Sequence, residues 1–213
     1  TYIEAKEPRK ISPFFNFGLL DLIVKTGIAD AVAEKLANLK GNQEAVAETI
    51  ENNVRSKIVE KNLTDPAYFA KMSALLDEII QLRKKRAIEY EAYLARIAEL
   101  AKKVVQPGGA DSGAHTKLNT QAKQALYNNL KDSPLLNTAK VAEPAPPYGE
   151  ADNEDEQRVE LAFKLHEAIL NHRPDSWRGN TAKENTVKAA MLGVLQNFDE
   201  VLRLFPIVCQ QQE

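Results

Sequence analysis

At 213 residues and 44% hydrophobic content, the chain can fill one sizeable core or two small ones, so a globular fold is the class to expect. Lysine and arginine (28) nearly balance aspartate and glutamate (30), which leaves a formal net charge of -2. A protein that binds nucleic acid through its overall charge usually has a clear excess of basic residues, so the net charge argues against that class. A single cysteine, Cys209, excludes an internal disulfide, and the sequence has neither a signal peptide nor an apolar run long enough for a membrane span.

These features predict a cytoplasmic protein that is not inserted in a membrane. The chain begins at Thr1, and its only methionines are Met72 and Met191. We therefore expect it to be part of a longer polypeptide.

Apolar residues recur in steps of three and four almost everywhere, and sustained alternation is almost absent, which predicts an all-α fold. Two short helices are expected over residues 14–27 and 28–39, the second ending before Gly41, a residue type that tolerates a left-handed cap. A longer helix is expected over residues 42–62. One face of that helix carries Val46, Ile50, Val54 and Ile58.

The sharpest boundary in the sequence is Thr64-Asp65-Pro66. Asp65 can cap free backbone N–H groups, and Pro66 suits a first helical turn, where its missing N–H is not needed. From there to residue 105 the apolar repeat fits one long helix or two. We expect two, with the break near four adjacent basic residues, Arg83, Lys84, Lys85 and Arg86, called here the basic cluster.

The Gly-rich stretch 106–118 predicts a flexible linker, so we expect two helical halves, residues 1–105 and 119–213. A helix over 119–130 opens the second half. The Pro-rich stretch 133–155 follows, and its scarcity of large apolar side chains predicts a long loop.

The last third returns to helical periodicity, with a helix that ends at His172-Arg173-Pro174. Thr181 and Glu184 have the spacing of a capping box, which predicts that a helix opens there and runs through Leu195. The same apolar face is expected to continue through Phe198, Val201, Leu202, Phe205 and Val208. The predicted architecture is a multi-helix bundle in two halves, because no repeat of fixed period indicates a solenoid.

The sequence offers little catalytic chemistry. Glycines of the stretch 108–113 lack the lysine of a phosphate-binding loop and follow no strand. The three histidines and the cysteine (His115, His166, His172 and Cys209) are too scattered for a metal site, and no carboxylates form an acid–base pair. We predict no catalytic, cofactor-binding or metal-binding residue.

Two features suggest binding instead. The basic cluster either contacts phosphates or an acidic patch on a partner, or is simply a solvated helix end. Trp177, the only tryptophan, is followed by Arg178 between two predicted helices. This pair either anchors a partner or fills the gap between the helices that it joins.

Four segments carry a resemblance to a known family. The first is Ala47–Arg55, which follows the short helices around Leu19 to Ala31, and the second is Asp65–Phe69, which leads through Met72 into Leu76. The third is Ile88–Leu94, which runs on to Leu100. The fourth is Ala125–Leu130, together with Asp175–Asn180 and Lys183–Val187. In this order they resemble the C-terminal helical region of the motor and endonuclease (R) subunit of type I restriction-modification enzymes. None of the segments is a catalytic motif, so the resemblance concerns a domain and not an active site.

The resemblance implies a large cytoplasmic assembly that recognises DNA through a specificity subunit, translocates DNA with ATP and cleaves it at a distance. The ATP, Mg²⁺ and nuclease sites of that family belong to earlier domains, and no position here matches them. The expected role of this chain is non-catalytic docking of the R subunit onto the methyltransferase and specificity subunits, with Trp177 and Arg178 in the docking surface.

Two other readings remain open. In the first, the chain guides duplex DNA along the motor, and the phosphate contacts are Arg83, Lys84, Lys85, Arg86, Lys102 and Lys103. In the second, the chain is an unrelated helical scaffold or adaptor. Salt separates DNA guidance from docking, because phosphate binding weakens steeply as ionic strength rises and apolar docking does not.

Overall fold

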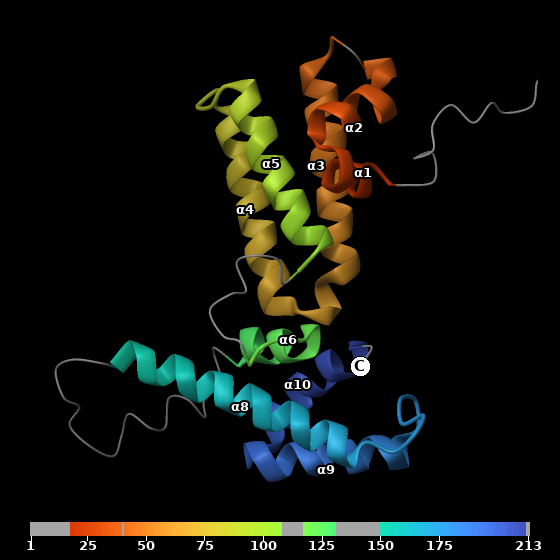
Figure 1. Cartoon of the computed structure of the whole chain (residues 1–213), viewed down its shortest axis with the longest axis vertical. Coiled ribbons are helices and arrows are strands. Elements are labelled where there is room, and N and C mark those ends of the chain that lie inside the picture. The colour runs from red at the N-terminus through yellow and green to blue at the C-terminus, as the bar shows by residue number, and fades with distance from the viewer. Residues whose placement is uncertain (1–17, 40, 108–116, 131–149, 212–213) are drawn as a thin grey trace, which may run out of the picture. The chain divides into compact units, whose positions relative to one another are not determined.

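A computed structural model of the chain describes residues 18–39, 41–107, 117–130 and 150–211 (Figure 1). All regular secondary structure in these residues is helical, which confirms the predicted all-α class. None of the helices in the described ranges is long and apolar enough to cross a membrane.

The chain packs into two compact units. Unit 1 comprises residues 1–57 and 75–105, and unit 2 comprises residues 58–74 and 106–213. Residues 58–74 fall within the predicted first half, whereas their packing places them in unit 2. The cause is a set of hydrogen bonds, described below, that join the start of this segment's helix to the helix after the linker.

Unit 1 is built around short and long helices that share one core. Its elements are α1 (Leu19–Thr26), α2 (Ile28–Lys35), η1 (Ala37–Leu39), α5 (Tyr90–Val105) and parts of α3 (Gln43–Lys61) and α4 (Pro66–Lys84). Helix α1 packs against α2 and α5. The predicted apolar row of α3 is confirmed, since its four members are at most 5% exposed. The predicted break at the basic cluster is also confirmed, because α4 ends at Lys84 and α5 begins at Tyr90.

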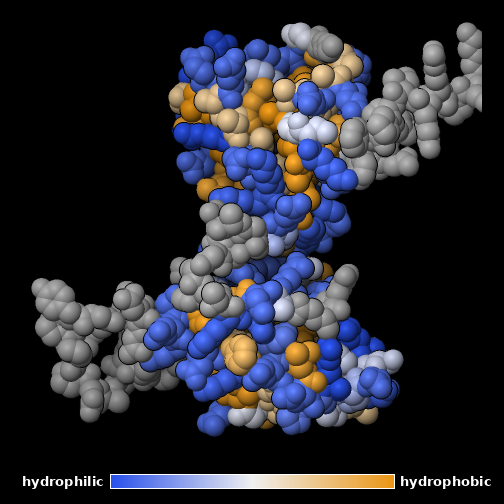
Figure 2. Space-filling model, in the orientation of Figure 1, coloured by the Kyte–Doolittle hydropathy of each residue, from blue (hydrophilic) through white to orange (hydrophobic). Residues whose placement is uncertain are grey.

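Unit 2 has one continuous core of its own. Its elements are η2 (Asn62–Thr64), α6 (Gln121–Asn129), α8 (Glu150–His172), α9 (Thr181–Leu195), α10 (Phe198–Gln210) and the remainder of α3 and α4. Helix α8 packs against α6 and α9, as Figure 1 shows for α9, and α10 packs against α9, α6 and η2. In the face drawn in Figure 2, hydrophilic residues cover most of each unit and hydrophobic residues form smaller patches.

Asp65 links the start of α4 to α6. Its Oδ1 accepts a hydrogen bond from the Tyr68 backbone N–H (3.1 Å), so the predicted cap is confirmed. Its two carboxylate oxygens also accept from the side-chain amides of Asn128 (2.7 Å) and Asn129 (2.8 Å). A buried cap with these partners explains why the segment around Asp65 belongs to unit 2.

The last part of the loop predicted over 133–155 is helical instead, because α8 begins at Glu150. The first turns of α8 are rich in acidic residues, and the helix dipole favours negative charge there even where large apolar side chains are scarce. Residues 131–149, which make up most of the predicted loop, and residues 108–116 of the predicted linker lie outside the described residues.

Helix α9 begins at Thr181, as predicted, but its cap lies one residue earlier. The Asn180 Oδ1 accepts from the Lys183 backbone N–H (3.2 Å), and Glu184 reaches past the cap to accept from the Gly179 N–H (2.8 Å). Asparagine is among the best capping residues, so the helix selects Asn180 over its neighbour.

The apolar face predicted to continue beyond Leu195 is interrupted. Gln196 adopts a left-handed conformation (φ 50°) and ends α9, and the Asn197 side chain caps α10 by accepting from the Glu200 N–H (3.1 Å). The new helix turns two of the predicted core residues outward, since Phe198 is 56% exposed and Leu202 is 47% exposed. The prediction of one continuous buried face is therefore wrong at these positions.

Candidate functional site

The basic cluster is anchored at its first residue. Arg83 donates two hydrogen bonds to the Glu51 carboxylate, from Nε (2.8 Å) and from Nη2 (3.1 Å). The two side chains are only 9% and 8% exposed. The Tyr93 hydroxyl donates to the same carboxylate (3.1 Å), and its ring centroid lies 5.7 Å from the guanidinium carbon. Arg83 is thus committed to the interior of unit 1.

The surroundings of Arg83 keep its guanidinium charged. Burial works against the charged guanidinium, but hydrogen bonds and charge from Glu51 and Glu44 outweigh it and raise the pKa of Arg83. Burial, assisted by the charge of Glu51, also raises the pKa of the Tyr93 hydroxyl, which therefore stays a hydrogen-bond donor. The result is a fixed, charge-assisted connection between α3, α4 and α5.

The other three members of the basic cluster form an exposed turn. The Arg86 N–H bonds the Arg83 carbonyl (2.9 Å) and the Ala87 N–H bonds the Leu82 carbonyl (2.9 Å), which together make a Schellman motif. Arg86 occupies its left-handed position, with φ 52°. Glycine is the usual residue there, because other residues pay about 1 kcal/mol or more for this conformation.

Lys102 and Lys103 do not join this turn. They lie in the last turn of α5, about 18 Å along the helix from its start at Tyr90, at 1.5 Å per residue. Lys102 also donates to Glu99 (2.7 Å) on the same helix. The six predicted DNA contacts therefore separate into a buried arginine, an exposed three-residue turn and a distant lysine pair.

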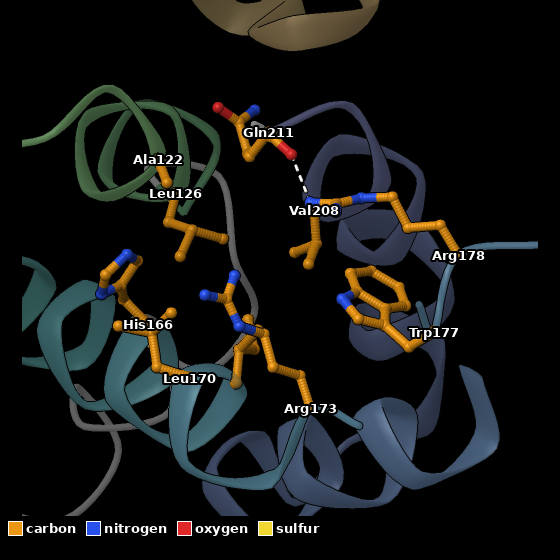
Figure 3. A pocket seen from close by; sticks show the side chains of 10 residues that line it. Ala122, Leu126, His166, Leu170, Arg173, Trp177, Arg178, Val208 and Gln211 are labelled. Carbon is orange, nitrogen blue, oxygen red and sulfur yellow. Dashed lines mark hydrogen bonds between the residues drawn. The ribbon is translucent and has the colours of Figure 1, made fainter. Parts of the chain in front are cut away.

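In unit 2, Trp177 and Arg178 line a narrow pocket between α6, α8 and α10 (Figure 3). Trp177 is 3% exposed, and its ring centroid lies 5.9 Å from that of Phe205 on α10. It packs against α10, and the reading in which it fills the gap between the two helices that it joins, α8 and α9, stays a prediction. The small edge that it exposes forms part of the pocket wall.

Arg178 is held across the end of α10. Its guanidinium carbon stacks 4.7 Å from the Trp177 ring centroid, its Nε donates to the Cys209 carbonyl (2.9 Å), and an Nη donates to the Gln211 carbonyl. These carbonyls have no helical donor at a C-terminus, so Arg178 acts as a cap. Only two of the guanidinium's five N–H donors are engaged in these bonds, which leaves donors for a ligand.

The remaining polar residues of the pocket were not predicted as site residues. They are Arg173 just after the end of α8, buried His166 about two turns before it, and Gln211 after α10. In Figure 3 the Arg173 guanidinium reaches between the α6 side of the pocket and Trp177. The signal in the sequence is weak, because Arg173 appears there only as a basic residue at the end of a predicted helix.

A third surface lies on the outer face of α10. Phe198, Leu202 and Pro206 are all exposed and follow one another at four-residue steps, which places them within about 80° of the helix surface. We call these three residues the α10 stripe. Pro206 has no N–H, so the Leu202 carbonyl also lacks its helical donor.

Candidates for catalytic chemistry are scarce in the described residues. No group of three or more histidines, cysteines or carboxylates within them is placed to hold a metal ion. Cys209 is half-buried, and burial raises the pKa of its thiol, which disfavours the reactive thiolate. Comparisons with protein-family models, with curated proteins and with solved structures found no match to the chain.

Proposed function

We propose that the chain is a non-catalytic helical module that docks the R subunit of a type I restriction-modification enzyme onto its methyltransferase and specificity subunits. In this proposal the parent enzyme is cytoplasmic, and ATP and Mg²⁺ act in its other domains. The module itself contributes protein contacts.

The observation that carries the proposal is the α10 stripe. A surface helix of a globular protein normally presents charged and polar residues to water. Here an exposed phenylalanine and leucine stand one turn apart, with a proline one turn further on. Exposed apolar residues that form a contiguous surface are typical of protein–protein contacts, and large side chains of this kind are the ones that bury area on binding.

The segments that carry the resemblance support the proposal in a second way, because they bond to one another. Glu51 in the first segment is bound by Tyr93 in the third. Asp65 in the second is bound by Asn128 and Asn129 in the fourth. The segments on which the resemblance rests thus make contacts that maintain the helical fold, as expected of a structural module.

The test is binding of the purified chain to the methyltransferase core of its own operon, compared between wild type and Leu202→Ser. Loss of one central apolar anchor should weaken binding by about tenfold or more, which corresponds to roughly 1.4 kcal/mol. The matched control is Leu75→Ser on α4, where leucine is 41% exposed but belongs to no such stripe. Equal affinities for wild type and both variants would remove the α10 stripe from the interface.

A second proposal is that the exposed turn of the basic cluster contacts the phosphates of duplex DNA. Arg86 favours it, because the chain keeps a long cationic side chain at a left-handed position where glycine is less strained. Arg83 fixes the helix end behind that turn. Binding of a duplex at low salt that is lost in Lys84→Gln and Lys85→Gln variants would favour this proposal over docking alone.

A further inference from the structure

The α10 stripe contributes a polar backbone atom as well as its three apolar side chains. The carbonyl of a helical residue points along the helix axis toward the residue four positions later, whose N–H normally bonds it. For Leu202 that residue is Pro206, which lies inside α10 and has no N–H to donate. The Leu202 oxygen therefore lies between the exposed side chains of Leu202 and Pro206 without this bond.

Proline at this position also changes the helix around that carbonyl. Its ring crowds the carbonyl four residues earlier, and the helix bends there. Carbonyls on the outer side of a bent helix tilt toward water, and Leu202 and Pro206 both face outward. The oxygen is thus presented at the surface, where water satisfies it while the chain is undocked.

Arg203, beside the stripe, holds α10 in this orientation. It donates to both carboxylate oxygens of Glu200 (2.9 and 2.8 Å) and to the Asn129 carbonyl at the end of α6 (2.9 Å). Glu200 is only 5% exposed, so this group of bonds lies at the side of α10 that faces α6. The bonds keep the stripe and the Leu202 carbonyl on the outside of unit 2.

A purely apolar partner surface would match the stripe poorly. Docking of such a surface removes water from the Leu202 carbonyl, and an acceptor that is buried without a donor weakens binding. A donor among the partner's apolar side chains restores the lost hydrogen bond. It also fixes the position of the partner, because hydrogen bonds are directional and the acceptor occupies one place along the stripe.

We propose that the α10 stripe recognises a surface of apolar side chains that carries one N–H or O–H donor, and that this donor bonds the Leu202 carbonyl. The inference rests on the proposed docking function in taking the methyltransferase core as the partner. Within that function it makes Pro206 a specificity-determining residue, because the proline leaves the acceptor open to the partner. Tyrosine and tryptophan suit the surface best as donors, since each combines an apolar body with a single donor and both are enriched at interfaces.

Pro206→Leu tests the inference, because it supplies a helical N–H to the Leu202 carbonyl and keeps an apolar side chain at the same place. The variant should be more stable than wild type, with a higher Tm, since proline is the least favourable residue inside a helix. Its affinity for the core, measured by titration calorimetry, should nevertheless fall about fivefold, the loss that corresponds to one weakened hydrogen bond. A role of Pro206 in folding alone would not weaken binding while stability rises.

The matched control is Pro66→Leu in the first turn of α4, where an added N–H has no helical carbonyl to bond. It should bind the core with wild-type affinity, and circular dichroism establishes that both variants keep their helix content. An affinity of Pro206→Leu equal to or above that of wild type would overturn the inference.

Leu202→Ser separates this inference from docking itself. If Leu202→Ser weakens binding of the core and Pro206→Leu does not, the inference fails while docking by the stripe stands. If both weaken binding and Pro66→Leu does not, both stand. If the core does not bind wild type, the docking function fails and the inference falls with it.

Discussion

Replacing Glu51 by glutamine should destabilise unit 1 strongly, although the change removes only a charge. Arg83 and Glu51 are 9% and 8% exposed at their side chains, so the arginine would keep a nearly buried charge without its carboxylate. Removing one partner of a buried pair costs about 3–5 kcal/mol. Glu44 also contacts Arg83, but its side chain is 66% exposed, so it offsets only part of that cost. We expect a loss of about 3 kcal/mol in the free energy of unfolding.

Thermal and urea denaturation followed by far-ultraviolet circular dichroism measure this loss. A decrease of about 3 kcal/mol corresponds to roughly 6–12 °C in Tm for a protein of this size. Asp77→Asn is the matched control, because Asp77 pairs with Arg55 at a similar distance (2.8 Å) while their side chains are 59% and 47% exposed. That variant should lose less than about 1 kcal/mol. If the two variants lost equal stability, burial would not be what distinguishes the Glu51 pair.

The remaining predictions concern the left-handed turn, the Asp65 cap and the tryptophan. Arg86→Gly should raise the free energy of unfolding by about 0.5–1 kcal/mol in urea denaturation, and Gln196→Gly, whose residue has a similar positive φ, should do the same. A lower free energy of unfolding in both variants would contradict the backbone strain assigned to these positions. Burial raises the pKa of Asp65, so the folded chain retains its proton after the unfolded chain has lost it. Stability of wild type relative to Asp65→Asn should therefore fall as pH rises from about 4 through the folded pKa, and a flat difference across denaturation curves at several pH values would contradict this. Trp177→Ala should cost roughly 3–5 kcal/mol in the same assay, because the ring is 3% exposed, and a loss below about 1 kcal/mol would show that it does not fill the gap.

The sequence predicted elements where local chemistry decides them. Asp65 and Pro66 start a helix whatever lies around them, because capping and a missing N–H are local properties, and α4 begins there. The α3 row was also predictable, since its spacing alone places four apolar residues on one face.

The sequence was less informative where distant residues decide the outcome. Arg83 appears in the chain as one of four equivalent cations, and its burial depends on Glu51, which lies 32 residues away. Arg86 ends its helix without a glycine, so the usual signal for a C-cap is missing. Arg173 and Arg178 line a pocket whose other walls come from α6 and the end of α10, which are distant in the sequence.

The α10 stripe shows a different kind of failure. Phe198 and Leu202 continue the apolar periodicity of α9, so the sequence assigned them to the core. The left-handed Gln196 resets the helix, and the same residues face outward. Apolar periodicity is expected to predict burial wrongly at surfaces that serve a function, which agrees with the role proposed for the α10 stripe.

Docking to a partner protein is the function proposed for the chain. The most direct test is co-purification of the chain with the methyltransferase core of its own operon, beside a titration with duplex DNA at low and at physiological salt. Docking predicts a complex with the core that persists at physiological salt, together with no DNA binding at that salt. DNA binding that weakens steeply with salt, without any complex with the core, would contradict it and shift the function to the basic cluster.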